Sequence, residues 1–179
     1  SPLLHVGIVG YGLVGKELVQ QISGGAEGLE KELGVSLQIS AVARSKAMAL
    51  LNQGWQDALS DGAWPKDDEP LNLDKLGQHL LAAATASGGR AIVVDNTASD
   101  APVDFYEHWL AAGIDVATPN KRAGSGPLDR YERILKAAKS GGSRFMYEAT
   151  VGAGLPIISP LQNLRRAGDN VLVVEGIFS

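Results

Sequence analysis

Hydrophobic positions along the chain follow two patterns that alternate, short apolar runs and a recurrence every three or four residues. Short apolar runs predict strands, and they lie at 5–9, 37–43, 91–94, 114–117 and 145–150. Apolar residues that recur every three or four positions predict helices over 13–22, 26–33, 71–86, 103–112 and 128–139, with a shorter helix over 46–51. Strands that alternate with helices favour an α/β fold, in which a doubly wound, mainly parallel sheet carries helices on both faces.

The first strand runs directly into a glycine-rich turn. Gly10, Gly12 and Gly15 have the spacing G-x-G-x-x-G, and helical periodicity begins immediately after them. This order of strand, turn and helix is the setting that the dinucleotide-binding fingerprint requires, so we expect a Rossmann-type domain. Gly10 would permit the tight turn, Gly12 would leave room for a pyrophosphate, and Gly15 would let the helix pack close to the strand. The helix N-terminus would offer free N–H groups to the phosphates.

The end of the second strand bears on the choice of cofactor. An acidic residue there would bind the ribose 2′-hydroxyl of NAD, whereas a nearby arginine accommodates the 2′-phosphate of NADP. The chain reads Ala43-Arg44-Ser45, with no acid. Arg44 therefore favours NADP, and NAD stays possible if Arg44 is only a solvated surface residue.

Polar side chains follow two further strands where each strand ends. Asn96 and Thr97 come after the run 91–94, and Lys121 comes shortly after the run 114–117. Ligands of open α/β sheets bind outside the carboxyl ends of the strands, so we expect these residues to face the cofactor. Lys121 is the one of them that can donate a proton or stabilise charge on an oxygen. Capping of the next helix by Ser99 or Asp100 explains part of the same loop.

Composition narrows the classes of function. Sixteen basic and twenty acidic residues give a net charge of −4, which disfavours nucleic-acid binding and a membrane-surface role. No apolar stretch reaches the roughly 20 residues of a membrane helix, and no targeting segment is recognisable, so we expect a cytoplasmic protein, or a plastid one in a plant or alga. Cysteine is absent, which excludes disulfides and a thiol nucleophile within this chain.

Several motifs together resemble homoserine dehydrogenase, in the right order along essentially the whole chain. They are the glycine turn, the segments 94–99 and 117–122, the long segment Tyr-Glu-Ala-Thr-Val-Gly-Ala-Gly-Leu-Pro at 147–156, and Glu-Gly-Ile-Phe-Ser at 175–179. The resemblance implies NAD(P)-dependent interconversion of L-aspartate 4-semialdehyde and L-homoserine, on the route to threonine, methionine and isoleucine. Hydride would pass to the aldehyde carbon and a proton to its oxygen.

The resemblance also implies roles for individual residues. Lys121 would be catalytic and would also contact the cofactor. The remaining cofactor contacts would come from Gly10, Gly12, Leu13, Val14, Gly15, Thr97 and Ala98. A monovalent cation, sodium or potassium, would be bound largely by backbone carbonyls near the joint between domains. The matching positions are Glu148, Val151, Ala153 and Leu155.

The resemblance finally predicts how the chain is organised. Residues 1–150 would form the NAD(P)-binding domain, and residues 151–179 would begin the substrate and dimerisation domain, which in the family continues further. We therefore expect this chain to bind cofactor but to be weakly active or inactive, and the full-length protein to be a homodimer. Two alternatives stay open: a cofactor-binding sensor or regulatory module without chemistry, and another oxidoreductase with the same first domain.

Overall fold

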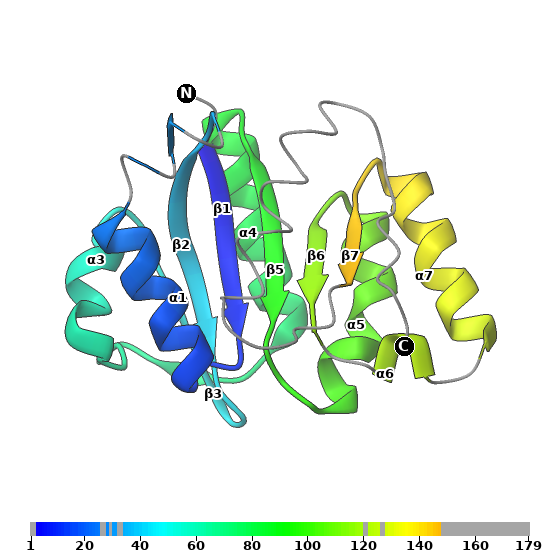
Figure 1. The fold of residues 1–179 in the computed structure, drawn as a ribbon, viewed down its shortest axis with the longest axis horizontal. Coiled ribbons are helices and arrows are strands. Elements are labelled where there is room, and N and C mark those ends of the chain that lie inside the picture. The colour runs from blue at the N-terminus through cyan, green and yellow to red at the C-terminus, as the bar shows by residue number, and fades with distance from the viewer. Residues whose placement is uncertain are drawn as a thin grey trace.

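A single twisted sheet forms the centre of the molecule (Figure 1). The computed structural model describes residues 3–25, 28, 30–31, 34–119, 122–125 and 128–147. In these residues the sheet has seven strands in the order β4-β3-β2-β1-β5-β6-β7. Their bounds are β1 (Leu3–Val9), β2 (Ser36–Ala43), β3 (Ala47–Leu50), β4 (Glu69–Pro70), β5 (Arg90–Asp95), β6 (Asp115–Thr118) and β7 (Phe145–Tyr147).

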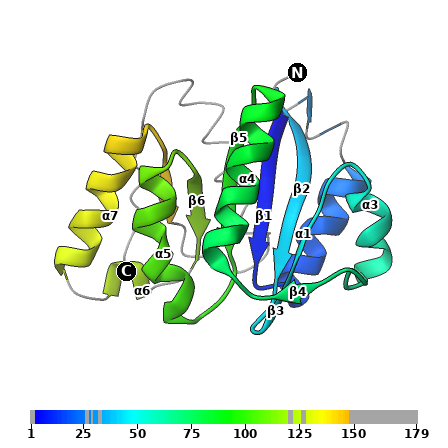
Figure 2. The ribbon, with the colours of Figure 1, turned by 180° about the vertical axis from the view of Figure 1, so that it is seen from behind.

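Helices cover both faces of this sheet, as Figures 1 and 2 show from opposite sides. Helix α1 (Leu13–Gly24) and the short α3 (Trp55–Ala58) pack on one face, together with the 3₁₀ turn η1 (Ser60–Gly62). Helices α4 (Leu73–Ser87), α5 (Asp100–Ala111) and α7 (Leu128–Gly141) pack on the other, and α6 (Arg122–Ser125) precedes α7. The buried apolar residues accordingly form two clusters, one on each side of the sheet.

The predicted fold class is confirmed, because β2, β1, β5, β6 and β7 are mutually parallel.

Local hydrogen bonds and backbone conformation explain where helix α4 begins and ends. Asn72 caps α4 by accepting a hydrogen bond of 2.9 Å from the Lys75 N–H, and Gly88 ends the helix with φ +67°.

The predicted helix over 46–51 is wrong. Its core, Ala47–Leu50, is strand β3, which pairs antiparallel with the end of β2 and places Met48 opposite Ala43. The Arg44 N–H donates to the Ala47 carbonyl at 2.9 Å and closes a tight connection between the two strands. Met48 and Ala49 are fully buried, so sheet pairing and burial outweigh the helical propensity of Ala, Met and Leu.

The strand order fixes where a ligand can bind. From β1 the chain crosses to β2 on one side, and β5 lies on the other side of β1. The carboxyl ends of β1 and β5 therefore flank the topological switch point, where the crevice of an open α/β sheet lies.

The opposite, amino edge of the sheet is braced by polar contacts. His5 of β1 is buried, with Nδ1 2.8 Å from Ser40 Oγ and Nε2 2.9 Å from Ser87 Oγ. Arg90 binds the buried carboxylate of Asp115 from the start of β5, with Nη2–Oδ1 and Nη2–Oδ2 distances of 2.8 and 3.0 Å. The Arg144 N–H donates to the same carboxylate at 2.8 Å.

Several predicted features lie outside the described residues. They are most of the helix over 26–33, everything after Tyr147, and therefore the domain boundary at residue 150. Within the part that is described, no helix is both long and apolar enough to cross a membrane.

Candidate cofactor site at the carboxyl edge of the sheet

The glycine turn after β1 touches the loop after β5. Gly10 has φ +95°, and a Cβ built on it would lie 3.0 Å from Thr97 Cγ2 and 3.2 Å from the Asn96 carbonyl carbon. The Asn96 N–H donates to the Val9 carbonyl at 2.8 Å. The structure thus brings three of the predicted site residues together at the switch point.

The other two glycines of the turn have different surroundings. A Cβ on Gly15 would lie 2.7 Å from the Gly10 carbonyl oxygen and 3.2 Å from Ile8 Cγ2, so only glycine lets α1 approach β1 this closely. A Cβ on Gly12 would meet nothing within 4 Å. The space at Gly12 is therefore open on the side where a pyrophosphate has to approach.

The start of α1 is free to receive an anion. Gly12 is the N-cap residue and has no side chain with which to cap the helix, and no acidic residue stands in the first turn. The first N–H groups of a helix have no partner within it, so here they face the open space with the positive end of the helix dipole. Leu13 and Val14 lie in this first turn with 84% and 41% of their surface exposed, which leaves them accessible to a ligand.

Asp95 holds the loop after β5 in one conformation. Its buried carboxylate accepts hydrogen bonds from the Thr97 N–H at 2.8 Å and from Thr97 Oγ1 at 2.6 Å. It also accepts a hydrogen bond from the hydroxyl of Tyr106 on α5. Burial raises the pKa of Tyr106 well above 10, and the neighbouring carboxylate adds to this, so the hydroxyl stays protonated as a donor. Asp95 and Tyr106 are not among the residues that we predicted for this site, although the Asp-x-Thr spacing is typical of a carboxylate that bonds to a backbone N–H two residues on.

The exposed side of this loop is held by an arginine. Arg122 Nε donates to the Ala98 carbonyl at 2.7 Å, and its Nη1 lies 3.1 Å from Asp100 Oδ2. Ser99 is the N-cap residue of α5, but its side chain makes no capping hydrogen bond to that helix. Asn96 Nδ2 is buried and has no acceptor in the part of the chain that the structure describes, so this amide has a donor to offer to a ligand.

Arg44 lies at the end of β2, as predicted, and contacts two residues that the sequence does not predict as its partners. Its guanidinium carbon lies 4.1 Å from the centre of the Trp64 ring, and Nη2 lies 3.9 Å from Asp68 Oδ2. Both partners are 20 or more residues further along the chain, in a segment without a recognisable motif. No local sequence signal could have found them.

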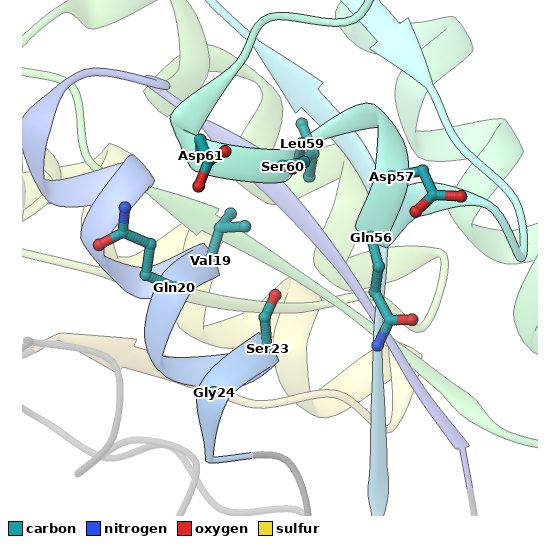
Figure 3. A pocket seen from close by; sticks show the side chains of 9 residues that line it. All are labelled: Val19, Gln20, Ser23, Gly24, Gln56, Asp57, Leu59, Ser60 and Asp61. Atoms are coloured by element: carbon teal, nitrogen blue, oxygen red, sulfur yellow. The ribbon is translucent and has the colours of Figure 1, made fainter.

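A separate cleft of about 510 Å³ lies between the second half of α1 and the segment that contains α3 and η1 (Figure 3). Figure 3 shows Val19 and Ser23 on the α1 side, and Leu59, Ser60 and Asp61 on the other. None of the predicted site residues within the described part of the chain lines it. Its lining residues are Val19, Gln20, Ser23, Gly24, Gln56, Asp57, Leu59, Ser60 and Asp61. The cleft is therefore distinct from the candidate cofactor site at the beginning of α1.

The described residues fit a dinucleotide. An open cradle at Gly12, an uncapped helix N-terminus, an exposed arginine at the end of β2 and an amide donor in the loop after β5 are the groups that such a ligand needs.

Comparison with known proteins shows to which family the chain belongs. Residues 10–148 match the family model for the NAD-binding domain of homoserine dehydrogenase. The chain belongs to the homoserine dehydrogenase family.

Individual relatives agree with this assignment. The chain is 41% identical over 181 residues to the chloroplastic bifunctional aspartokinase/homoserine dehydrogenase 1 of Zea mays, and the match covers 98% of this chain and 19% of the relative. It is 38% identical to the homoserine dehydrogenase of Schizosaccharomyces pombe, with 98% of this chain and 46% of the relative covered. The chain thus spans about a fifth to a half of the length of these relatives.

Solved structures show the same fold. A Candida auris protein of unknown function superposes with a TM-score of 0.64 at 32% identity, covering 94% of this chain and 45% of the other. A hyperthermophilic archaeal homoserine dehydrogenase mutant, solved in complex with NADPH, superposes with a TM-score of 0.59 at 25% identity, covering 88% and 47%. The family and the geometry together support an NAD(P)-binding domain.

Lys121 and the four predicted cation ligands, Glu148, Val151, Ala153 and Leu155, lie outside the described residues. Within the described ranges, no three histidines or acidic residues lie together in a way that could hold a metal ion.

Proposed function

We propose that this chain is the NADP-binding part of a homoserine dehydrogenase that interconverts L-aspartate 4-semialdehyde and L-homoserine. The observation that carries the proposal is the contact between Gly10 and the Asn96-Thr97 loop at the switch point of the sheet. This contact brings the phosphate-binding turn and the loop at the reacting end of the cofactor into one site, in a chain of the homoserine dehydrogenase family.

Different described residues bind different parts of the cofactor. The backbone of Gly10, Gly12, Leu13, Val14 and Gly15 holds the pyrophosphate through the N-terminus of α1. Asn96, Thr97 and Ala98 contact the nicotinamide side, in a loop that Asp95 and Arg122 fix. NADPH bound there would supply the hydride that the aldehyde carbon accepts, and in the reverse direction NADP would accept a hydride from the alcohol carbon of homoserine.

NADP rather than NAD is the cofactor in this proposal. Arg44 is exposed at the end of β2, where the 2′-phosphate of NADP is bound in this fold, and no acidic residue precedes or follows it directly. The NADPH complex of the archaeal relative supports the same choice.

Lys121 acts on the oxygen atom of the substrate. We assign to it the stabilisation or protonation of the substrate oxygen, because an ammonium group stabilises the negative charge that develops there when hydride arrives. The carbonyls of Val151, Ala153 and Leu155, together with Glu148, bind a sodium or potassium ion. The full-length protein forms a homodimer, and its substrate domain supplies the other substrate contacts.

Calorimetry with NADPH and an assay of homoserine oxidation test the proposal together. The 179-residue chain is expected to bind NADPH and to oxidise homoserine slowly or not at all. A chain extended past Ser179 is expected to bind NADPH and to oxidise homoserine. In the extended chain, Lys121→Met is expected to abolish turnover and to weaken NADPH binding only by the loss of its own contact, so that NADPH binding is still detected by calorimetry. NADPH binding without turnover in the extended chain would favour the sensor module over the enzyme.

A further inference from the structure

The partners of Arg44 come from a segment that neither the glycine fingerprint nor the end of β2 accounts for. Trp64 lies under the guanidinium group, and Asp68 lies beside it. Half of the Arg44 side chain, 53%, is exposed, so the group is held on one side and accessible on the other.

Trp64 is itself fixed in place. Its Nε1–H donates to Asp68 Oδ2 at 2.8 Å, and its ring centre lies 5.8 Å from that of Tyr11. Tyr11 belongs to the glycine turn, is buried, and donates from its hydroxyl to the Ala63 carbonyl at 3.2 Å. The plane of Trp64 is therefore set relative to the same turn that holds the pyrophosphate.

The backbone of Arg44 is tied to that turn as well. The preceding residue, Ala43, accepts hydrogen bonds from the N–H groups of Gly10 and Tyr11 at 2.9 and 3.0 Å. Both ends of Arg44 are thus fixed relative to the phosphate-binding turn. Strand β2 fixes its backbone, and Trp64 fixes its guanidinium group.

We propose that Trp64 and Asp68 are positioning and specificity-determining residues that set the choice between NADP and NAD through Arg44. This inference rests on the proposed function. Trp64 holds the guanidinium flat, so that less side-chain freedom is lost when Arg44 binds the 2′-phosphate. Asp68 places a negative charge beside the same guanidinium and competes with the 2′-phosphate for it.

The two residues therefore act in opposite directions. Trp64 favours NADPH because it preorganises the cation that recognises the phosphate. Asp68 disfavours NADPH because it already neutralises that cation and repels the phosphate. NADH lacks the 2′-phosphate, so neither the preorganised guanidinium nor the repulsion between Asp68 and the phosphate acts on it, and the ratio of the two dissociation constants reports both effects. A carboxylate at this place also accepts from the ribose 2′-hydroxyl of NADH, which moves the ratio in the same direction as the repulsion.

Calorimetric Kd values for NADPH and NADH with the 179-residue chain test the proposal. Trp64→Leu is expected to lower the NADH-to-NADPH Kd ratio about three- to tenfold through a weaker affinity for NADPH. Trp64→Phe keeps a flat ring under Arg44 and is expected to restore most of the ratio. Asp68→Asn keeps an oxygen to accept from Trp64 Nε1 but removes the charge, and is expected to raise the ratio by about the same factor.

A double variant separates positioning from general structural damage. With Arg44→Ala in the background, Trp64→Leu is expected to leave the ratio unchanged, because its effect passes through Arg44. Equal weakening of both cofactors by Trp64→Leu, a full effect that persists in the Arg44→Ala background, or a ratio that Asp68→Asn leaves unchanged would each overturn the inference. Unfolding midpoints in urea show whether each variant is folded.

The same measurements distinguish this inference from the proposed function. A ratio that Arg44→Ala leaves unchanged would overturn the assignment of NADP to Arg44, and with it this inference. A ratio that responds to Arg44→Ala but to neither Trp64→Leu nor Asp68→Asn would overturn the inference alone.

Discussion

At the scale of single residues, two glycines of one turn are required for different reasons. A methyl group on Gly15 would lie 2.7 Å from the Gly10 carbonyl oxygen, whereas one on Gly12 would lie in open space. Gly15→Ala should therefore lower the free energy of unfolding by about 1–3 kcal/mol, as overpacking does. Gly12→Ala should cost at most about 1 kcal/mol of stability, because alanine is a poorer N-cap residue than glycine, and should raise the Kd for NADPH about tenfold or more, since the methyl group takes the space of the pyrophosphate. Urea unfolding and calorimetry on the two variants check this, and normal NADPH binding by Gly12→Ala would place the phosphates elsewhere.

His5 predicts a pH dependence of stability. Burial lowers its pKa below the usual 6.5, and the nearby His79 adds to this, so protonation favours the unfolded chain. Its contribution is fully present above pH 6.5 and is lost as the pH falls from there through the lowered pKa. His5→Gln, which can still hydrogen-bond to Ser40 and Ser87, should flatten the fall in stability between pH 7 and pH 5. An unchanged slope in urea titrations would mean that another group titrates there.

At the scale of elements, α5 holds the loop after β5 through one hydroxyl. Tyr106→Phe leaves the buried Asp95 carboxylate without that donor, which should cost about 1–3 kcal/mol of stability. The freed carboxylate should also loosen the Asn96-Thr97 loop, which weakens NADPH binding and speeds amide exchange at Thr97.

Ser143→Ala is the matched control for this loop. It removes another buried hydroxyl, which donates to the Leu110 carbonyl at 2.6 Å, but it lies away from the loop. It should lower stability and leave both NADPH binding and exchange at Thr97 unchanged. If Tyr106→Phe behaves in the same way, the hydroxyl has no part in positioning the loop.

Elements with a strong local pattern could be predicted from the sequence, and elements made by pairing could not. The run 91–94 and the glycine turn carry their period and spacing within a few residues, and both lie where we expected them. Strand β3 consists of good helix formers and becomes a strand only because β2 offers its edge. The same limit applies to the site: Gly10 and Thr97 follow from motifs, whereas the contact of Trp64 with Arg44 depends on the folded path of residues 51–70.

At the scale of the whole molecule, the groups that bind the cofactor and the polar contacts that stabilise the fold lie at opposite edges of the sheet. The carboxyl edge carries the open turn and the accessible Arg44, whereas the amino edge carries buried, mutually satisfied polar groups around His5 and Asp115. Changes at the amino edge should therefore alter stability without altering the Kd for NADPH, because the site residues that the structure describes lie at the carboxyl edge.

The Arg90–Asp115 pair provides the test of this separation. Burial raises the pKa of Asp115 although Arg90 opposes the rise, so the ionised carboxylate is tolerated only with its partner. Arg90→Met removes the guanidinium and leaves the buried charge with the Arg144 N–H as a donor, which should cost about 3 kcal/mol at neutral pH. A raised folded pKa means that stability is present at low pH and lost as pH rises through it, so the variant should regain stability as the pH is lowered. Arg90→Met with Asp115→Asn removes the charge and should be more stable at pH 7 than Arg90→Met alone, with the NADPH Kd unchanged in both. A double variant no more stable than the single one in urea unfolding would show that the lost contacts, and not the buried charge, set the cost.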